Sequence, residues 1–92
     1  MTLPVQIAGA WSGALEKLDG TQLLLRSPKA FPPGQPLELL VDAGTERVAL
    51  SARAIGSKRR DADWFELRVR LVNLRKDARE ALDRVWRSVE RG

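Results

Sequence analysis

The side chains with the clearest capacity for binding chemistry lie between residues 58 and 64. Lys58, Arg59 and Arg60 are three consecutive cations, and the indole of Trp64 follows shortly after them. Cations beside an indole can hold a phosphate and stack on a nucleobase or on an arginine of another protein. The same residues also fit a solvated turn, with Trp64 packed on the rim of a β-sheet. The sequence leaves both interpretations open.

Asp61 and Asp63 lie in the same segment and resemble a pair of carboxylate ligands. A cation site here would need a third acidic ligand, which the loop does not supply. The chain contains no Cys and no His, which excludes thiolate and imidazole metal ligands, disulfides and every nucleophile–histidine pair. We therefore predict a non-enzymatic protein with no catalytic residue, no metal and no cofactor.

Trp11 is the second aromatic candidate, and it stands in an N-terminal segment of fifteen residues without a single charge. It either packs on one side of a core or rim, or it shares an exposed face with Trp64. An exposed pair of indoles would form an aromatic hot spot for another protein. The candidate partner-binding residues are therefore Lys58, Arg59, Arg60, Trp64 and Trp11.

Charge is distributed unevenly along the chain. Residues 1–46 carry three Lys or Arg against five Asp or Glu, whereas residues 47–92 carry thirteen against seven. A basic half suggests an anionic partner such as nucleic acid, a nucleotide, lipid headgroups or an acidic protein face. A mixed-sign surface that only maintains solubility is the alternative.

The elements that must position these residues are organised around a long antiparallel hairpin between residues 46 and 74. Both arms alternate with a period of two, which predicts strands with one buried face. The buried positions would be Val48, Leu50, Ala52 and Ala54 in the first arm, and Phe65, Leu67, Val69 and Leu71 in the second. The connection from Gly56 to Asp63 is polar and begins with Gly, which predicts a solvated tip.

Shorter strands precede this hairpin. Residues 3–8 and 10–18 have strand composition, and the Asp19-Gly20 pair predicts a tight turn into a returning strand over residues 21–26. Residues 27–36 contain four prolines and are expected to form a loop. A fourth strand segment over residues 37–41 ends in a turn at residues 42–45.

After Leu74 the apolar period changes from two to about 3.6, which predicts an amphipathic helix over residues 76–90. Asn73 is the expected N-cap of this helix. Its apolar stripe would cover the sheet, with Trp86 in the core between them: Ala78, Ala81, Leu82, Val85, Trp86 and Val89. We therefore predict a mainly β fold, a small six-stranded antiparallel barrel or strongly curved sheet with one C-terminal helix.

Length limits the chain to one domain over residues 1–92, with the barrel at about residues 3–74. No apolar run approaches the roughly 20 residues that a membrane-spanning helix needs. The start of the sequence also lacks the basic leader of a secretory signal. We expect a soluble, cytoplasmic protein.

The order of these elements resembles the PilZ domain. The similarity covers roughly residues 5–86 and rests on the turn at Gly20, the run Leu23–Leu25, the proline-rich loop leading into Leu37–Leu39, the segment Ala52–Ile55, the strand Phe65–Leu71 and a closing helix. PilZ domains are six-stranded barrels known mainly as bacterial receptors for cyclic di-GMP. The resemblance implies a role in bacterial signalling.

The two ligand-binding signatures of that family are RxxxR, at or before the first strand, and (D/N)xSxxG, at the end of the next. Here no Arg or Lys precedes Lys17, so RxxxR is absent. If Gly20 is the family glycine, Leu15 replaces the Asp or Asn and Lys17 replaces the Ser. Each lost arginine removes charge-assisted hydrogen bonds worth roughly 1.5–3 kcal/mol apiece.

The resemblance and its departures together suggest a regulatory module that acts by protein–protein interaction and has lost the cyclic di-GMP site. Its partner would be another bacterial protein, regulatory or motility-related. The alternative is an anion-binding module that recognises cyclic di-GMP at a different site, or nucleic acid, through the basic hairpin residues Lys58–Arg60.

Overall fold

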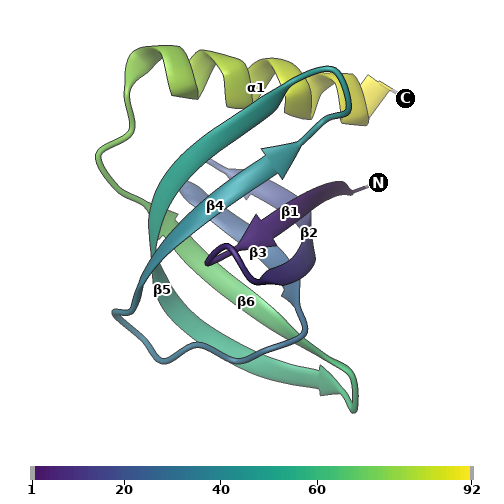
Figure 1. Ribbon diagram of the computed structural model, residues 1–92, viewed down its shortest axis with the longest axis vertical. Coiled ribbons are helices and arrows are strands. Elements are labelled where there is room, and N and C mark those ends of the chain that lie inside the picture. Colours follow the sequence, from purple (N-terminus) through teal and green to yellow (C-terminus); the bar gives the residue numbers. More distant parts are fainter. Residues whose placement is uncertain (1, 92) are drawn as a thin grey trace.

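The computed structural model describes residues 2–91, with side chains described as far as Val89, and it forms a closed antiparallel barrel followed by one helix (Figure 1). Around the barrel the strands follow the order β1-β2-β3-β6-β5-β4, and each neighbouring pair is antiparallel. The elements are β1 (Leu3–Ile7), β2 (Trp11–Asp19), β3 (Gln22–Ser27), β4 (Pro36–Asp42), β5 (Arg47–Asp61), β6 (Trp64–Leu71) and α1 (Lys76–Arg91). The predicted fold class is confirmed.

Alternation of apolar and polar side chains builds the barrel interior. In β1, for example, Leu3, Val5 and Ile7 point inward while Pro4 and Gln6 remain exposed. The predicted inward positions of the long hairpin are also buried, namely Val48, Leu50, Ala52 and Ala54 in β5 and Leu67, Val69 and Leu71 in β6. Phe65 is only half-buried, because β6 leaves the core near the end of the barrel.

The predicted tip at Gly56–Asp63 is solvated, since the side chains of residues 58–63 are exposed, but the prediction that this whole segment forms the turn is wrong. Strand β5 continues to Asp61, and the turn consists of Ala62 and Asp63 alone. Two register shifts, between Ala54 and Gly56 and again before Asp61, bend β5 while its backbone stays paired with β6. Side-chain polarity misled the prediction, because pairing satisfies backbone groups even where every side chain is in water.

The predicted turn at Asp19-Gly20 is present. Gly20 has a φ of +62°, in the left-handed region that glycine adopts at little cost. The adjoining strands differ from the predicted boundaries by one residue at each end.

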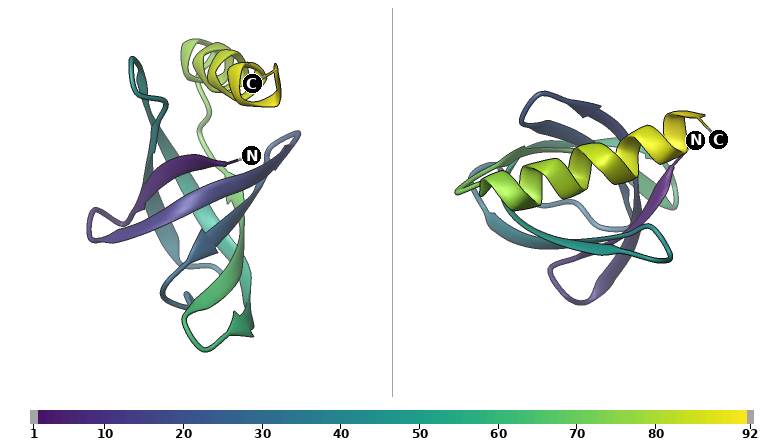
Figure 2. Two further views of the ribbon diagram at one scale, coloured as in Figure 1. Left: turned by 90° about the vertical axis from the view of Figure 1, so that its right-hand side faces the viewer. Right: turned by 90° about the horizontal axis from the view of Figure 1, so that it is seen from above.

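Helix α1 lies across one open end of the barrel (Figures 1 and 2). Leu82 and Val85 of its apolar stripe are buried, and Trp86 and Val89 pack partly buried against the same core. The packing role predicted for Trp86 is therefore confirmed. The helix covers the end of the barrel that the strands leave open, which completes a core too small to exclude water alone.

Asn73 is not the N-cap. The helix begins at Lys76, and the first helical hydrogen bond runs from the Arg79 amide to the Arg75 carbonyl. Asn73 instead has a φ of +51° and turns the chain between β6 and the helix. Asn tolerates this left-handed conformation better than most residues, which explains its presence there.

An ion pair joins the helix to the turn between β4 and β5. Arg84 donates two hydrogen bonds to the Glu46 carboxylate, the Nε bond measuring 3.2 Å. These hydrogen bonds from Arg84 lower the pKa of Glu46 below its ordinary value. Both groups are exposed to solvent, so the pair orients the helix more than it stabilises the fold.

Gly13 allows the barrel to close tightly at β2. A Cβ at this position would lie 2.2 Å from the Arg26 carbonyl oxygen and 3.0 Å from Ile7 Cδ1. Any side chain would therefore collide with the backbone of β3. Elsewhere in the fold, no helix within residues 2–91 is long and apolar enough to cross a membrane.

Candidate functional site

Contacts between aromatic rings and cations gather around the start of β2, the end of β3 and the β5–β6 hairpin, and we call this surface the aromatic end. The β5–β6 hairpin lies at the end of the barrel away from α1 (Figures 1 and 2). The aromatic end comprises the rings of Trp11, Trp64 and Phe65 with the cations Arg26, Lys29 and Arg59, and the ring of Phe31 lies buried beneath it.

Each of these cations lies near a ring. The Arg26 guanidinium carbon is 4.2 Å from the centroid of the Trp64 ring. Lys29 Nζ lies 5.7 Å from the Trp11 centroid and 5.8 Å from that of Phe31, and Arg59 Cζ lies 5.8 Å from that of Phe65. All four separations fall within the range of cation–π attraction, which holds flexible side chains in preferred positions.

The two candidate tryptophans occupy this same end, with different exposure. Trp11 keeps 39% of its surface exposed, whereas Trp64 is half-buried beneath Arg26. For Trp64 the structure combines the two alternatives from the sequence, since the ring packs at the rim but stays partly accessible. Trp11 is exposed, but two indoles exposed on one face, as the second alternative required, are not present, because Trp64 is half-buried.

The three consecutive cations of the hairpin do not form one cluster. Arg60 pairs with Glu66 at 2.9 Å, and Lys58 lies opposite the same Glu66 in the strand register. The Arg59 guanidinium lies near the ring of Phe65 and donates a hydrogen bond to the Ala62 carbonyl oxygen. Alternation along a strand separates neighbouring side chains, which a sequence run does not reveal.

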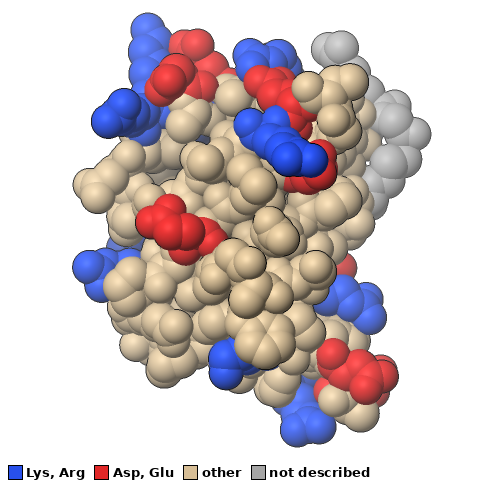
Figure 3. Space-filling model, viewed as in Figure 1, with Lys and Arg blue, Asp and Glu red and all other residues tan. Residues whose placement is uncertain are grey.

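Acidic groups reduce the positive charge of the tip further. Asp61 accepts a hydrogen bond from the Ala62 amide at 2.6 Å, and Asp63 follows in the turn. Figure 3 shows basic and acidic atoms side by side where the hairpin ends. Among the residues described, no three acidic side chains gather into a cluster that could hold a metal ion.

Sequence reasoning missed Arg26 and Lys29. The Asp19-Gly20 turn pairs Asp19 with Gln22, and counting back evenly from it would place Trp11 opposite Ala30. A bulge between Leu15 and Lys17 shifts the register by one residue, and Lys29, in the loop after β3, lies beside Trp11. The turn signal was visible in the sequence, but the bulge was not.

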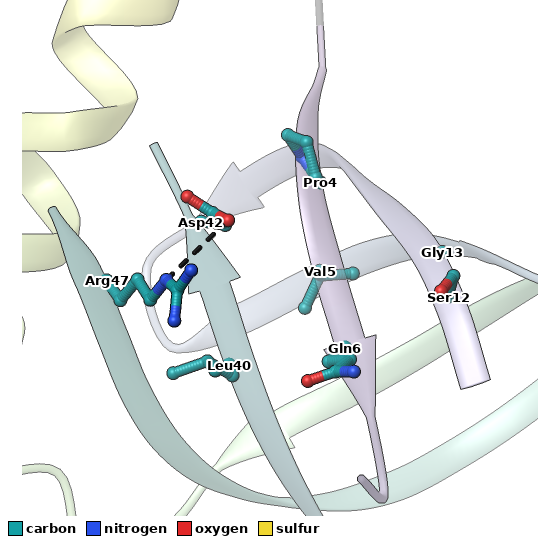
Figure 4. Close-up of a pocket in the computed structure, with 8 residues that line it drawn as sticks. All are labelled: Pro4, Val5, Gln6, Ser12, Gly13, Leu40, Asp42 and Arg47. Atoms are coloured by element: carbon teal, nitrogen blue, oxygen red, sulfur yellow. Dashed lines mark ion pairs between the residues drawn. The ribbon is translucent and has the colours of Figure 1, made fainter. Parts of the chain in front are cut away.

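A shallow hollow lies on another side of the barrel, over the outer face of β1 (Figure 4). It has a volume of about 370 Å³ and is lined by Pro4, Val5, Gln6, Ser12, Gly13, Leu40, Asp42 and Arg47. Its one cation, Arg47, already faces Asp42 at 3.7 Å. The hollow therefore offers an anionic ligand much less than the aromatic end does.

Comparison with known proteins identified no relative of this chain. No family model, no curated protein and no solved structure matches the chain.

Proposed function

We propose that this chain is a non-enzymatic, PilZ-like regulatory module that acts by binding another protein through its aromatic end. The observation that carries the proposal is an exposed indole, Trp11, held beside Lys29 at the same end as the stacked Arg26–Trp64 pair. Tryptophan and arginine are the residues most enriched at the energetic centres of protein interfaces. Cation–π stacking also reduces the side-chain entropy that binding would otherwise remove.

A protein partner fits this end better than a polyanion. Arg60 is already paired with Glu66, and Asp61 and Asp63 place two more negative charges at the tip. A nucleic acid would approach these carboxylates together with the cations, which lowers the electrostatic gain. Protein interfaces accommodate mixed charges readily, because both signs find partners across them.

Loss of the cyclic di-GMP site is supported by the position of Leu15. If Gly20 is the family glycine, Leu15 replaces the Asp or Asn of PilZ proteins, and its side chain is fully buried in the core. Gly20 is the one retained residue of that signature, and the left-handed backbone conformation of the turn is enough to explain it. The absence of any cation before Lys17 removes the arginines that would grip the phosphates.

Cyclic di-GMP is expected not to bind at micromolar concentration, and isothermal titration calorimetry of the purified protein tests this. A dissociation constant in the low micromolar range would contradict the proposal. If such binding disappeared in a Lys58→Ala, Arg59→Ala, Arg60→Ala variant, the hairpin tip would be a replacement nucleotide site.

The aromatic end itself is tested by combining Trp11→Ala with Trp64→Ala. A partner anchored on these rings should lose about 2 kcal/mol or more of binding free energy, because truncation empties the centre of the interface. The measurement is affinity capture from bacterial lysate with quantitative mass spectrometry, followed by titration of the captured protein. Unchanged melting temperature would show that the variant is folded.

A control variant with Lys76→Ala and Arg87→Ala, two exposed positions on α1, should retain the partner. If the double tryptophan variant keeps every captured protein, the aromatic end is not the interface. If the captured material is nucleic acid bound with submicromolar affinity at physiological salt, the alternative function replaces this one.

A further inference from the structure

The outer surface of β3, β6 and β5 carries a second concentration of cations, separate from the aromatic end. Arg70 lies between Gln22 of β3 and Arg53 of β5 in the strand register, and Arg68 lies beside Leu24 of β3. We call the surface formed by Arg53, Arg68 and Arg70 with the flanking Leu24 and Ile55 the arginine face. All three arginines are exposed.

Among the described side chains, none of these arginines forms an ion pair with a carboxylate, although Asp19 lines the same hollow as Arg68. The ion pairs found among the described side chains are Arg47–Asp42, Arg60–Glu66, Arg79–Asp83 and Arg84–Glu46. Arg53 donates to the Gly34 carbonyl at 3.1 Å, which is a neutral acceptor. Arg53 and Arg70 are directly opposed across the strands, an arrangement of like charges that destabilises a sheet.

Aliphatic side chains lie among these cations. Ile55 has 39% of its surface exposed on β5, next to Gly56, the residue opposite Arg68. Leu24 is half-buried on the other side of Arg68. Trp64, half-buried with Arg26 over its ring, belongs to the aromatic end and not to this face. The face therefore combines guanidinium forks with apolar contact area.

We propose that the arginine face docks an acidic segment of another protein, in which carboxylates recur beside aliphatic side chains. This inference rests on the proposed function and adds a second surface to it, with a stated partner chemistry. Arginine forks match carboxylates bidentately, and Ile55 and Leu24 would meet the apolar side chains between them. A phosphodiester backbone would supply the charge but nothing to cover Ile55.

The spacing of the cations suits such a segment. Arg68 and Arg70 are two residues apart on one strand, which separates them by roughly 6.8 Å. Carboxylates four residues apart on a helix are separated by a similar distance, about 6 Å. One acidic helix could therefore engage Arg68 with one carboxylate and the Arg53–Arg70 pair with the next.

The test uses a fluorescent synthetic helix of about 16 residues with Glu at every fourth position and Leu in the adjacent row. Fluorescence anisotropy at physiological salt should show saturable binding to the wild-type protein. In the Arg68→Glu, Arg70→Glu variant the affinity should fall about tenfold or more, because charge-assisted hydrogen bonds are replaced by repulsion. Thermal melting verifies that the variant is folded.

A matched control carries the same change of charge away from this face, with Lys76→Glu and Arg87→Glu on α1. It should keep the wild-type affinity within about twofold, since distant exposed charges are screened. Ile55→Ser, which changes no charge, should weaken binding about threefold through lost apolar contact.

Three results would overturn the inference. One is an absence of peptide binding up to millimolar concentration, and another is an equal loss in both charge-reversal variants. The third is tighter binding of a single-stranded DNA of about 20 nucleotides, with a salt slope of about −0.7 per phosphate that vanishes in Arg68→Glu, Arg70→Glu. A Trp11→Ala, Trp64→Ala variant should still bind the peptide, so failure at one surface is distinguishable from failure at the other.

Discussion

Replacing Leu82 by Asp is expected to leave little or no folded protein at 25 °C. Leu82 is fully buried where α1 meets the barrel core. The substitution removes roughly 1.5–3 kcal/mol of apolar burial and places a carboxylate inside the apolar core, at a further cost of several kcal/mol. A domain of this size has a total stability of roughly 5–15 kcal/mol. Circular dichroism and gel filtration would show an unfolded or aggregated chain.

Two companion variants make this result interpretable. Leu82→Ala should remain folded but lose about 2–5 kcal/mol of unfolding free energy in urea titrations, because it leaves a cavity without a buried charge. Ser88→Asp, at an exposed position of the same helix, should change stability little. A Leu82→Asp protein with the wild-type melting temperature would show that α1 does not cover the barrel.

Gly13→Val should destabilise the barrel by about 3 kcal/mol or more, which places it among the most damaging single substitutions outside the apolar core. The new Cβ would lie 2.2 Å from the Arg26 carbonyl oxygen, far inside van der Waals contact. That oxygen belongs to the backbone of a strand paired on both sides, so it cannot move aside cheaply. Urea titration of wild type and variant measures the loss directly.

Gly56→Val is the matched control, since Gly56 also lies within a strand but has open space around it. A Cβ there would meet no heavy atom within 4 Å, and its φ lies outside the left-handed region. Its effect should stay within about 0.5 kcal/mol, as for most exposed substitutions. Equal losses in the two variants would show that strand propensity, and not the contact with β3, explains the cost at Gly13.

Hydrophobic periodicity was sufficient to predict most of the barrel. The alternation from Val48 to Ala54 and from Leu67 to Leu71 identified the inward faces of β5 and β6, and the change to a helical period identified α1. Periodicity succeeds because each element must bury one face, and the spacing of the apolar residues shows which face that is. It failed between Gly56 and Asp61, where the strand continues without a buried face.

The candidate site was predicted only in part. Trp11 and Trp64 were identified from their residue type, but nothing local indicated that both would lie at the aromatic end. Arg26 meets Trp64 through the pairing of β3 with β6, and Lys29 reaches Trp11 from the loop that follows β3. The arginine face depends equally on the pairing of β5, β6 and β3, which brings Arg53 opposite Arg70.

The sequence by itself determined the fold class, the helix and the inward faces of the strands, because these follow from local patterns of apolar side chains. It also excluded thiol and imidazole chemistry, through the absence of Cys and His. Only the tertiary structure decided closure of the barrel, the register at the bulge and which cations remain without carboxylate partners. Those features arise from contacts between residues far apart in the chain, and their geometry depends on how whole strands pair.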